Sequence, residues 1–364
     1  MIRSRKITII LVAVVLVGSA AVFGIVIFAT VGEYEYSETY YYEPGNSSPI
    51  EILNIESDIG AINIKYNKTP TEFYAKIDLD IHIRGPLVAG KSFSDFFKPI
   101  QWLKSSSPVT FDIDTKSTTW FFFGISRRIT INVTLRTDVI YDVNAFASTG
   151  AIDMNVPQNI IVNKTTLSTS TGSVRLNSAV NTTFQGKVRI STSTGSAKSY
   201  AIKTNFTQGL HATTSTGSLT LNFTSTILGG DLIGTVSTGS INIKSYNMIY
   251  AQDSSIWNIK SSTGSIKVQI QQYVEMGADV DGSIQTSTGS IDVDYKDNQA
   301  SVGAQFTGST STGSTTYTNI GSGGFNLPVG DVFSSINYVT AIYKYELSLS
   351  TSTGSIEVQG QSAY

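Results

Sequence analysis

After about residue 50, apolar residues alternate with polar ones along most of the chain, which is the pattern of half-buried β-strands. Reading backwards from Gly289, Thr286 and Ile284 fall on one side of such a strand. Beyond the glycine, Ile291 and Val293 resume the alternation, with its phase broken once by the Gly-Ser pair. This pattern predicts two strands joined by a tight corner at the glycine.

The same strand, corner and strand recur along the chain with a nearly fixed period. From Gly150 to Gly313, successive corner glycines are 22 to 25 residues apart. One copy has too little apolar surface to fold alone, so the copies are expected to stack and bury one continuous core. The sequence therefore predicts an all-β fold, a β-solenoid of about ten 22–25-residue repeats. The predicted corner glycines are Gly60, Gly150, Gly172, Gly195, Gly217, Gly239, Gly264, Gly289, Gly313 and Gly354.

The residue three places after the glycine is polar in every copy, so this column is expected to face water. If the copies stack in register, Asp153 lies beside Arg175 and Lys267 lies beside Asp292. Each pair joins opposite charges on neighbouring strands and would stabilise the stack by about 0.2–1 kcal/mol.

The Thr-x-Thr pattern before each glycine suggests another hypothesis, an ice-binding or crystal-binding face of ordered threonines. The alternation argues against it, because Thr192 and Thr194 fall on the same side as Ile190, which must be core. We therefore expect these threonines to point inward.

The phrases STSTGSVRL, TSTGSLTLNF and TSTGSIEVQG carry a resemblance to a known family. They resemble the putative-adhesin β-strand-repeat family, a domain of uncharacterised function in bacterial and archaeal surface proteins. The resemblance covers roughly Ile50 to Gln359, apart from one insertion. It implies a single β-solenoid domain on the cell exterior and brings no catalytic motif with it.

One interval is much longer than the period, since 90 residues separate Gly60 from Gly150. It contains an aromatic-rich insertion at residues 84–128. One hypothesis is that the insertion caps the open end of the solenoid; the other is that its aromatic residues contact a membrane surface or a partner. The candidate contact residues are Phe96, Phe97, Trp102, Trp120, Phe121, Phe122 and Phe123.

The N-terminal segment differs from the rest of the chain. Residues 7–31 carry no charge and follow the basic residues Arg3, Arg5 and Lys6. A helix of this length spans roughly 37 Å, enough to cross a ~30 Å hydrocarbon core. We expect a cytoplasmic tail at 1–6, a transmembrane signal-anchor helix at 7–31, a stalk at 32–49 and an extracellular domain at 50–364. A cleaved signal peptide is the alternative.

Composition removes several function classes. The net charge of −2 gives no basic surface for nucleic acid. The chain has no cysteine and two histidines, His82 and His211, which excludes disulfides, thiol catalysis and cysteine-ligated metals. We expect no catalytic residue, no cofactor and no metal site.

The leading functional prediction is non-catalytic adhesion or cell-surface interaction with an unknown surface protein or glycan. The alternatives are a self-associating surface scaffold and an enzyme that acts on polysaccharide. Seven N-x-S/T sequons fit an exterior location. The candidate glycosylation sites are Asn46, Asn67, Asn132, Asn163, Asn181, Asn205 and Asn222.

Overall fold

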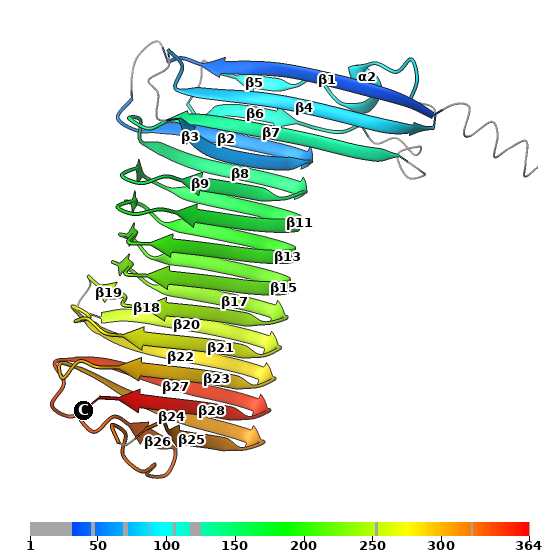
Figure 1. Ribbon diagram of the computed structural model, residues 1–364. Helices are drawn as coiled ribbons and strands as arrows, with labels where there is room; N and C mark the ends of the chain where they lie inside the picture. The colour runs from blue at the N-terminus through cyan, green and yellow to red at the C-terminus, as the bar shows by residue number, and fades with distance from the viewer. Residues whose placement is uncertain are drawn as a thin grey trace, which may run out of the picture.

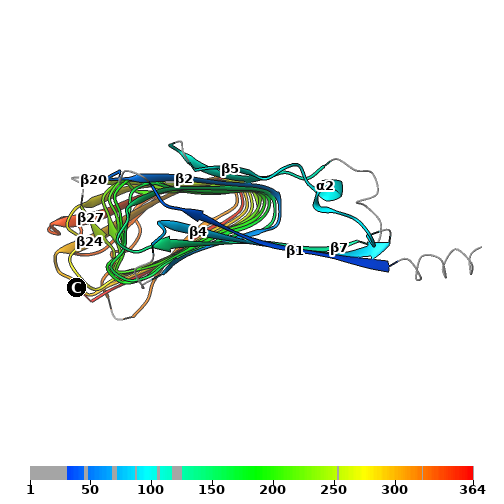
Figure 2. The ribbon, with the colours of Figure 1, turned by 90° about the horizontal axis from the view of Figure 1, so that it is seen from above.

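The two strands of each repeat share a corner at the repeat glycine, and successive repeats lie side by side as parallel strands (Figure 1). Seen along the stack, the coils superimpose in one flattened outline (Figure 2). The all-β part of the predicted fold is therefore confirmed. The structure, a computed structural model, describes residues 31–44, 48–67, 72–86, 88–104, 107–116, 125–251, 254–321 and 323–363.

Each coil has one strand before the corner and one strand after it. In three coils a single strand continues through the corner: β11 (Thr165–Ser178), β13 (Val188–Ile202) and β15 (Leu210–Thr224). In the other coils, the strands before the corner are β2 (Glu51–Ile59), β8 (Tyr141–Thr149), β17 (Leu232–Thr238), β20 (Ser254–Thr263), β22 (Asp279–Thr288), β24 (Val302–Thr312) and β27 (Tyr343–Thr353). The strands after the corner are, in the same order, β3 (Ala61–Asn67), β9 (Ile152–Val156), β18 (Ile241–Tyr246), β21 (Ile266–Gln272), β23 (Ile291–Asp297), β25 (Thr315–Asn319) and β28 (Ile356–Ser362).

The coils stack in register, with glycine opposite glycine at the corner. Both predicted ion pairs are confirmed: Arg175 Nη1 lies 3.6 Å from Asp153 Oδ1, and Lys267 Nζ lies 3.0 Å from Asp292 Oδ2. These side chains are exposed to solvent, so each pair contributes at most about 1 kcal/mol. The stack is held mainly by its buried aliphatic columns and its backbone hydrogen bonds.

The corner requires glycine for two reasons. The φ angles of the ten corner glycines lie between +124° and +149°, where a residue with a Cβ is strained. The backbones also approach closely, because a Cβ on Gly217 would lie 1.7 Å from the carbonyl oxygen of Gly195 in the next coil. Each corner thus packs against the carbonyl oxygen of the neighbouring corner only because it lacks a side chain.

Buried hydroxyls tie neighbouring corners together. In most coils the residue three places before the glycine is a buried Thr or Ser that donates to the carbonyl oxygen of the neighbouring corner glycine. Thr286 Oγ1 donates to Gly264 over 3.0 Å, and Thr192 Oγ1 donates to Gly172 over 3.2 Å. These bonds satisfy a carbonyl that the corner would otherwise bury without a partner. Val236 takes this position in one coil and donates no such bond.

A short third face and a second corner, which the sequence analysis did not anticipate, complete five of the coils. The residues before this face have positive φ and recur every 22 positions; three of them are Asn, one is Lys and one is Ser. The third face buries Phe184 against Phe206, with ring centroids 5.1 Å apart. Its strands are β10 (Ile161–Val162), β12 (Thr183–Phe184), β14 (Asn205–Phe206), β16 (Ile227–Leu228) and β19 (Ile249–Tyr250).

A cap covers the N-terminal end of the stack. Strand β6 (Val109–Ile113) pairs with β2 and β7 (Ser126–Arg136) pairs with β3, both parallel. Strand β4 (Ala75–Pro86) then runs antiparallel to β7, and β1 (Val31–Tyr42) runs antiparallel to β4. Strand β5 (Gln101–Leu103) pairs with β6, and the short helix α2 (Phe93–Phe96) packs against β1. We call β1, β4 and β7 the cap sheet.

The predicted fold class needs a correction at the N-terminus. Among the described residues no helix is long and apolar enough to cross a membrane. The helix expected at 7–31 lies outside these residues except for Val31, which begins β1. The expected stalk at 32–49 also differs, because residues up to Tyr42 form a strand of the cap sheet. Alternate tyrosines of this strand, such as Tyr34 and Tyr40, pack against the core.

The C-terminal coils do not follow chain order. The last repeat, β27 and β28, lies between the coil of β22 and β23 and the coil of β24 and β25. Thus β24 and β25 end the stack in space although they precede β27 in sequence (Figure 1). The short strand β26 (Val332–Ser334) pairs antiparallel with β24. The terminal coil is therefore joined to inner coils at both of its ends, which opposes fraying.

A buried carboxyl joins the inserted coil to its neighbour. Ser362 Oγ, at the end of β28, donates to Asp297 Oδ1 at the end of β23 over 2.7 Å. Asp297 is only 4% exposed, and burial raises its pKa from 3.8 to about 6. Its ionised form is therefore costly in the folded protein.

We predict that Gly217→Ala lowers the free energy of unfolding by at least about 3 kcal/mol, because the added Cβ overlaps a backbone oxygen and alanine is strained at φ +136°. Gly330→Ala is the matched control. Gly330 has φ +59° and no atom within 4 Å of an added Cβ, so only strain of about 1 kcal/mol is expected. The free energies are measured by thermal or urea unfolding. If the two variants lost the same free energy of unfolding, the close approach of stacked corners would be contradicted.

We also predict that Asp297→Asn stabilises the protein at pH 7.5 but not at pH 4. The folded state holds the Asp297 proton more tightly than the unfolded state, so wild-type stability falls as the pH rises from about 4 to about 6. An asparagine at position 297 keeps an oxygen that accepts the hydrogen bond from Ser362, and it cannot ionise. The expected gain at pH 7.5 is roughly 2–3 kcal/mol, measured by chemical unfolding at both pH values. A gain that is the same at pH 4 would exclude ionisation as its cause.

Candidate functional site

The outer side of each corner presents two consecutive hydroxyl residues. The ladder between neighbouring coils pairs Thr169 with Thr192 and Thr171 with Thr194 but omits the serine between them. The strand therefore turns at this point, and both the serine and the second threonine face solvent. This corrects the sequence-based expectation: Thr192 is buried as predicted, whereas Thr194 points outward because the corner breaks the alternation.

These outward residues form a continuous row that we call the hydroxyl ribbon. In eight coils both members of the Ser-Thr pair are exposed. The pairs follow one another in register, so the row spans roughly 34 Å at ~4.8 Å per coil. The ribbon consists of Ser170 and Thr171, Ser193 and Thr194, Ser215 and Thr216, Ser237 and Thr238, Ser262 and Thr263, Ser287 and Thr288, Ser352 and Thr353, and Ser311 and Thr312.

A shallow hollow of about 420 Å³ runs beside the ribbon over its C-terminal coils. Ser262, Ser287 and Ser352 line it together with Lys260 and Gln285. Each hydroxyl can both donate and accept a hydrogen bond, and no carboxylate is among the described residues that line the hollow. The hollow is therefore suited to a hydroxyl-rich ligand.

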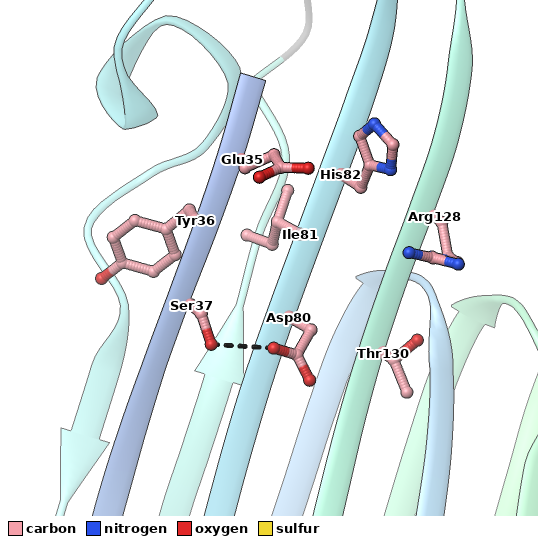
Figure 3. A pocket seen from close by; sticks show the side chains of 8 residues that line it. All are labelled: Glu35, Tyr36, Ser37, Asp80, Ile81, His82, Arg128 and Thr130. Carbon is pink, nitrogen blue, oxygen red and sulfur yellow. Dashed lines mark hydrogen bonds between the residues drawn. The ribbon is translucent and has the colours of Figure 1, made fainter. Parts of the chain in front are cut away.

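The outer face of the cap sheet holds a second hollow, of about 490 Å³. It is built from three strands in register, with Glu35 opposite His82 and His82 opposite Arg128 (Figure 3). One row further along, Ser37 Oγ donates to Asp80 Oδ1 over 2.8 Å. This hollow combines acidic, basic and hydroxyl groups, in contrast to the ribbon.

Within the described residues, one group at the cap sheet could hold a metal ion. Ligand atoms of Glu33, Glu35 and His82 all lie within 4.8 Å of one another. The Nε2 atom of His82 is in contact with Glu33 Oε1, and both side chains are partly open to solvent. His211 is far from this group in sequence, on β15, and burial lowers its pKa.

The inner side of β1 is aromatic and packs on the insertion. Tyr34 contacts Phe96 with ring centroids 5.1 Å apart, and Tyr36 contacts Phe93 at 4.9 Å. The hydroxyls of Tyr36 and Tyr40 donate to Glu38, and these hydrogen bonds hold the pKa of Glu38 below its ordinary value. The cap sheet is thus supported from behind by packed rings.

Three of the aromatic residues proposed as membrane or partner contacts are described, and these three lie in the cap. Phe96 and Phe97 are 0% and 1% exposed. Trp102 is half-buried, with its ring centroid 5.9 Å from that of Tyr40. Their burial leaves Phe96 and Phe97 unavailable for surface contact, which corrects that hypothesis for them. Trp120, Phe121, Phe122 and Phe123 lie outside the described residues.

The candidate glycosylation sites differ in access. Asn181 is exposed, at the second corner with φ +59°. Asn132 and Asn163 are half-buried and their amides donate or accept hydrogen bonds, while the Oδ1 atom of Asn222 is buried. Of the described sequon asparagines, Asn181 is the most exposed, and its Nδ2 donates to Asn159 Oδ1 over 3.2 Å. Asn67 and Asn205 are half-buried at strand positions, and Asn46 lies outside the described residues.

Comparison with known proteins gives a likeness to solved structures alone. No family model matches the chain, and no curated protein matches it. A putative cell adhesion protein from Clostridium sporogenes is 11% identical with a TM-score of 0.22, covering 90% of this chain and 100% of that chain. A putative lipid binding protein from Parabacteroides distasonis is 10% identical with a TM-score of 0.39, covering 89% and 96%. A putative adhesin from Bacteroides fragilis is 12% identical with a TM-score of 0.33, also covering 89% and 96%.

These identities and TM-scores are too low to assign a family or a function. The resemblance of the repeat phrases to the putative-adhesin β-strand-repeat family therefore stays a prediction from the sequence.

Proposed function

We propose that the chain is a non-catalytic binding protein, a stiff rod that acts in adhesion or cell-surface interaction through its hydroxyl ribbon. The observation that carries the proposal is the register of the ribbon, in which eight exposed Ser-Thr pairs repeat once per coil. A partner that is itself repetitive and rich in hydroxyls would match this spacing. A surface polysaccharide has both properties, so a glycan is the proposed partner.

The expected strength of binding follows from the number of contacts. A single hydrogen bond to an exposed hydroxyl contributes only about 0.5–1.5 kcal/mol. Repetition raises the affinity, because the second and later contacts form at high effective concentration once the first has formed. The fixed register of the coils favours this mode, since the hydroxyls need no reordering on binding.

The competing hypothesis of a polysaccharide-acting enzyme has less support. Hydrolysis of glycosidic bonds commonly uses a pair of carboxyl groups on either side of the bond. The described residues that line the hollow beside the ribbon supply hydroxyls, one amide and one lysine. Catalysis at the ribbon would thus lack the groups that the reaction needs.

The test is binding of the purified chain to a glycan array and to immobilised cell-wall polysaccharides. We predict saturable binding that the double variant Ser287→Trp with Ser352→Trp weakens at least about tenfold, because the two indoles fill the hollow. Thr316→Trp is the matched control, since Thr316 is exposed on the strand beyond the corner. A chain that stays monomeric and binds none of these polymers would contradict the proposal, as would equal weakening by the control.

A scaffold that assembles end to end is the second candidate, and one observation favours it. The segment between β25 and β27, which includes β26, carries the most exposed aliphatic side chains of the described residues, among them Leu327 at 89%, Val329 at 79% and Val339 at 84%. Strand β26 lies at the distal end of the stack (Figure 1). Exposed aliphatic surface of this kind commonly marks interaction sites.

For the scaffold, the expected result is growth of oligomers with concentration in sedimentation velocity. Changing Leu327, Val329 and Val339 to serine should abolish the growth by removing the apolar contact. Ile161→Ser, at an exposed position near the capped end of the stack, should leave the growth of oligomers unchanged. A monomer at all concentrations would remove this candidate and leave the binding rod.

A further inference from the structure

We propose that Glu33, Glu35 and His82 form a binding site for a divalent transition-metal ion of the zinc class on the outer face of the cap sheet. This inference goes beyond the proposed function, because the cap sheet lies apart from the hydroxyl ribbon. It rests on strand register, on the chemistry of the three ligands and on the hollow beside them.

Strand register brings the three side chains together. Glu33 and Glu35 are two residues apart on β1 and therefore point to the same face. His82 of β4 is the direct cross-strand partner of Glu35. The ligand atoms of all three lie within 4.8 Å of one another, so a single ion placed among them could reach each with small rotations of the side chains.

The ligand set selects the class of metal. One imidazole nitrogen and two carboxylates are ligands that Zn²⁺ and neighbouring first-row ions accept. Calcium and magnesium prefer a shell made entirely of oxygen, so the histidine disfavours them. Three protein ligands leave at least one position of a tetrahedral shell open.

The hollow provides room for the remaining ligands. Glu35 and His82 both line the space of about 490 Å³ on the cap sheet (Figure 3). Water or an external group could occupy the open position there. Arg128 faces the same hollow beside His82, which would favour an anionic group at that position.

His82 contacts Glu33, and both side chains are partly exposed to solvent. A solvent-exposed contact of this kind contributes little to stability by itself. The location of the cluster matters as well, because β1 is an outer strand of the cap sheet, paired with β4 on one side. An ion bound across β1 and β4 would join this strand to its neighbour through side chains in addition to the backbone.

The experiment is isothermal titration of the full chain with zinc chloride, alone and in the presence of excess calcium. Wild type should bind one equivalent of Zn²⁺, and calcium should not displace it. His82→Gln and Glu35→Gln should each weaken binding at least about tenfold, since loss of a direct ligand costs no less than loss of an outer-shell partner. Zinc should also raise the melting temperature of wild type but not of His82→Gln.

The matched control is His211→Gln, which removes the other histidine of the chain. This variant should bind zinc like wild type. The proposal is overturned if wild type shows no saturable zinc binding, or if His82→Gln and His211→Gln bind it equally well. Because polysaccharide binding at the ribbon is measured without zinc, failure of the metal site would leave the proposed function standing.

Discussion

The structure depends on the close approach of glycine backbones at the corners. Neighbouring corners are so near that a Cβ on one would lie 1.7–2.3 Å from the carbonyl oxygen of the other along the stack from Gly150 to Gly354. This contact fixes the register of each coil on the next, since a shift by one residue would place a side chain in the contact. The buried Thr hydroxyls then satisfy the glycine carbonyls. The same register aligns the outward Ser and Thr residues, so the core and the hydroxyl ribbon follow from one constraint.

The ends of the stack show how a solenoid of identical corners avoids fraying. At one end the chain doubles back, so the repeat at Gly60 is covered by β6 and β7, which come later in sequence. At the other end the last repeat enters between two earlier coils. In both cases the outer layer is held by covalent connections on its two sides. A terminal coil in chain order would have only one such connection, and its strand edges would be easier to open.

The sequence predicted the strands and the glycine corners of the repeat but missed three other features of the stack. The period and the alternation around each glycine were sufficient to predict the strands, the corner and the ion pair of Lys267 with Asp292. The orientation of Thr194 was missed, because the corner skips one ladder position and strict alternation cannot show this. The second corner was missed because its five residues share a conformation but not one fixed residue: three are Asn, one is Lys and one is Ser. The order of the last coils could not be predicted, since corners with the same sequence fit one another in any order.

The cap sheet lies outside the repeat, and its site was missed for that reason. The alternation in residues 75–86 would have placed Asp80, His82 and Arg84 on one outward face. The pairing of this strand with β1 could not be read from the sequence, because residues 32–49 were interpreted as a stalk. Once β1 is placed in the sheet, Glu35 and His82 become direct partners. A site built from nonrepeating strands thus depends on pairings that the local pattern does not contain.

The central claim is that the corners form one row whose spatial order differs from the order of the chain. Cysteine cross-linking at the ribbon tests it most directly, because the chain has no cysteine of its own. Thr353 has two in-register partners, Thr288 on one side and Thr312 on the other. The account predicts that Thr288→Cys cross-links with Thr353→Cys, and that Thr353→Cys cross-links with Thr312→Cys, because adjacent coils are within disulfide reach. Cross-linking of Thr288→Cys with Thr312→Cys, which would require those two coils to be neighbours, would contradict it.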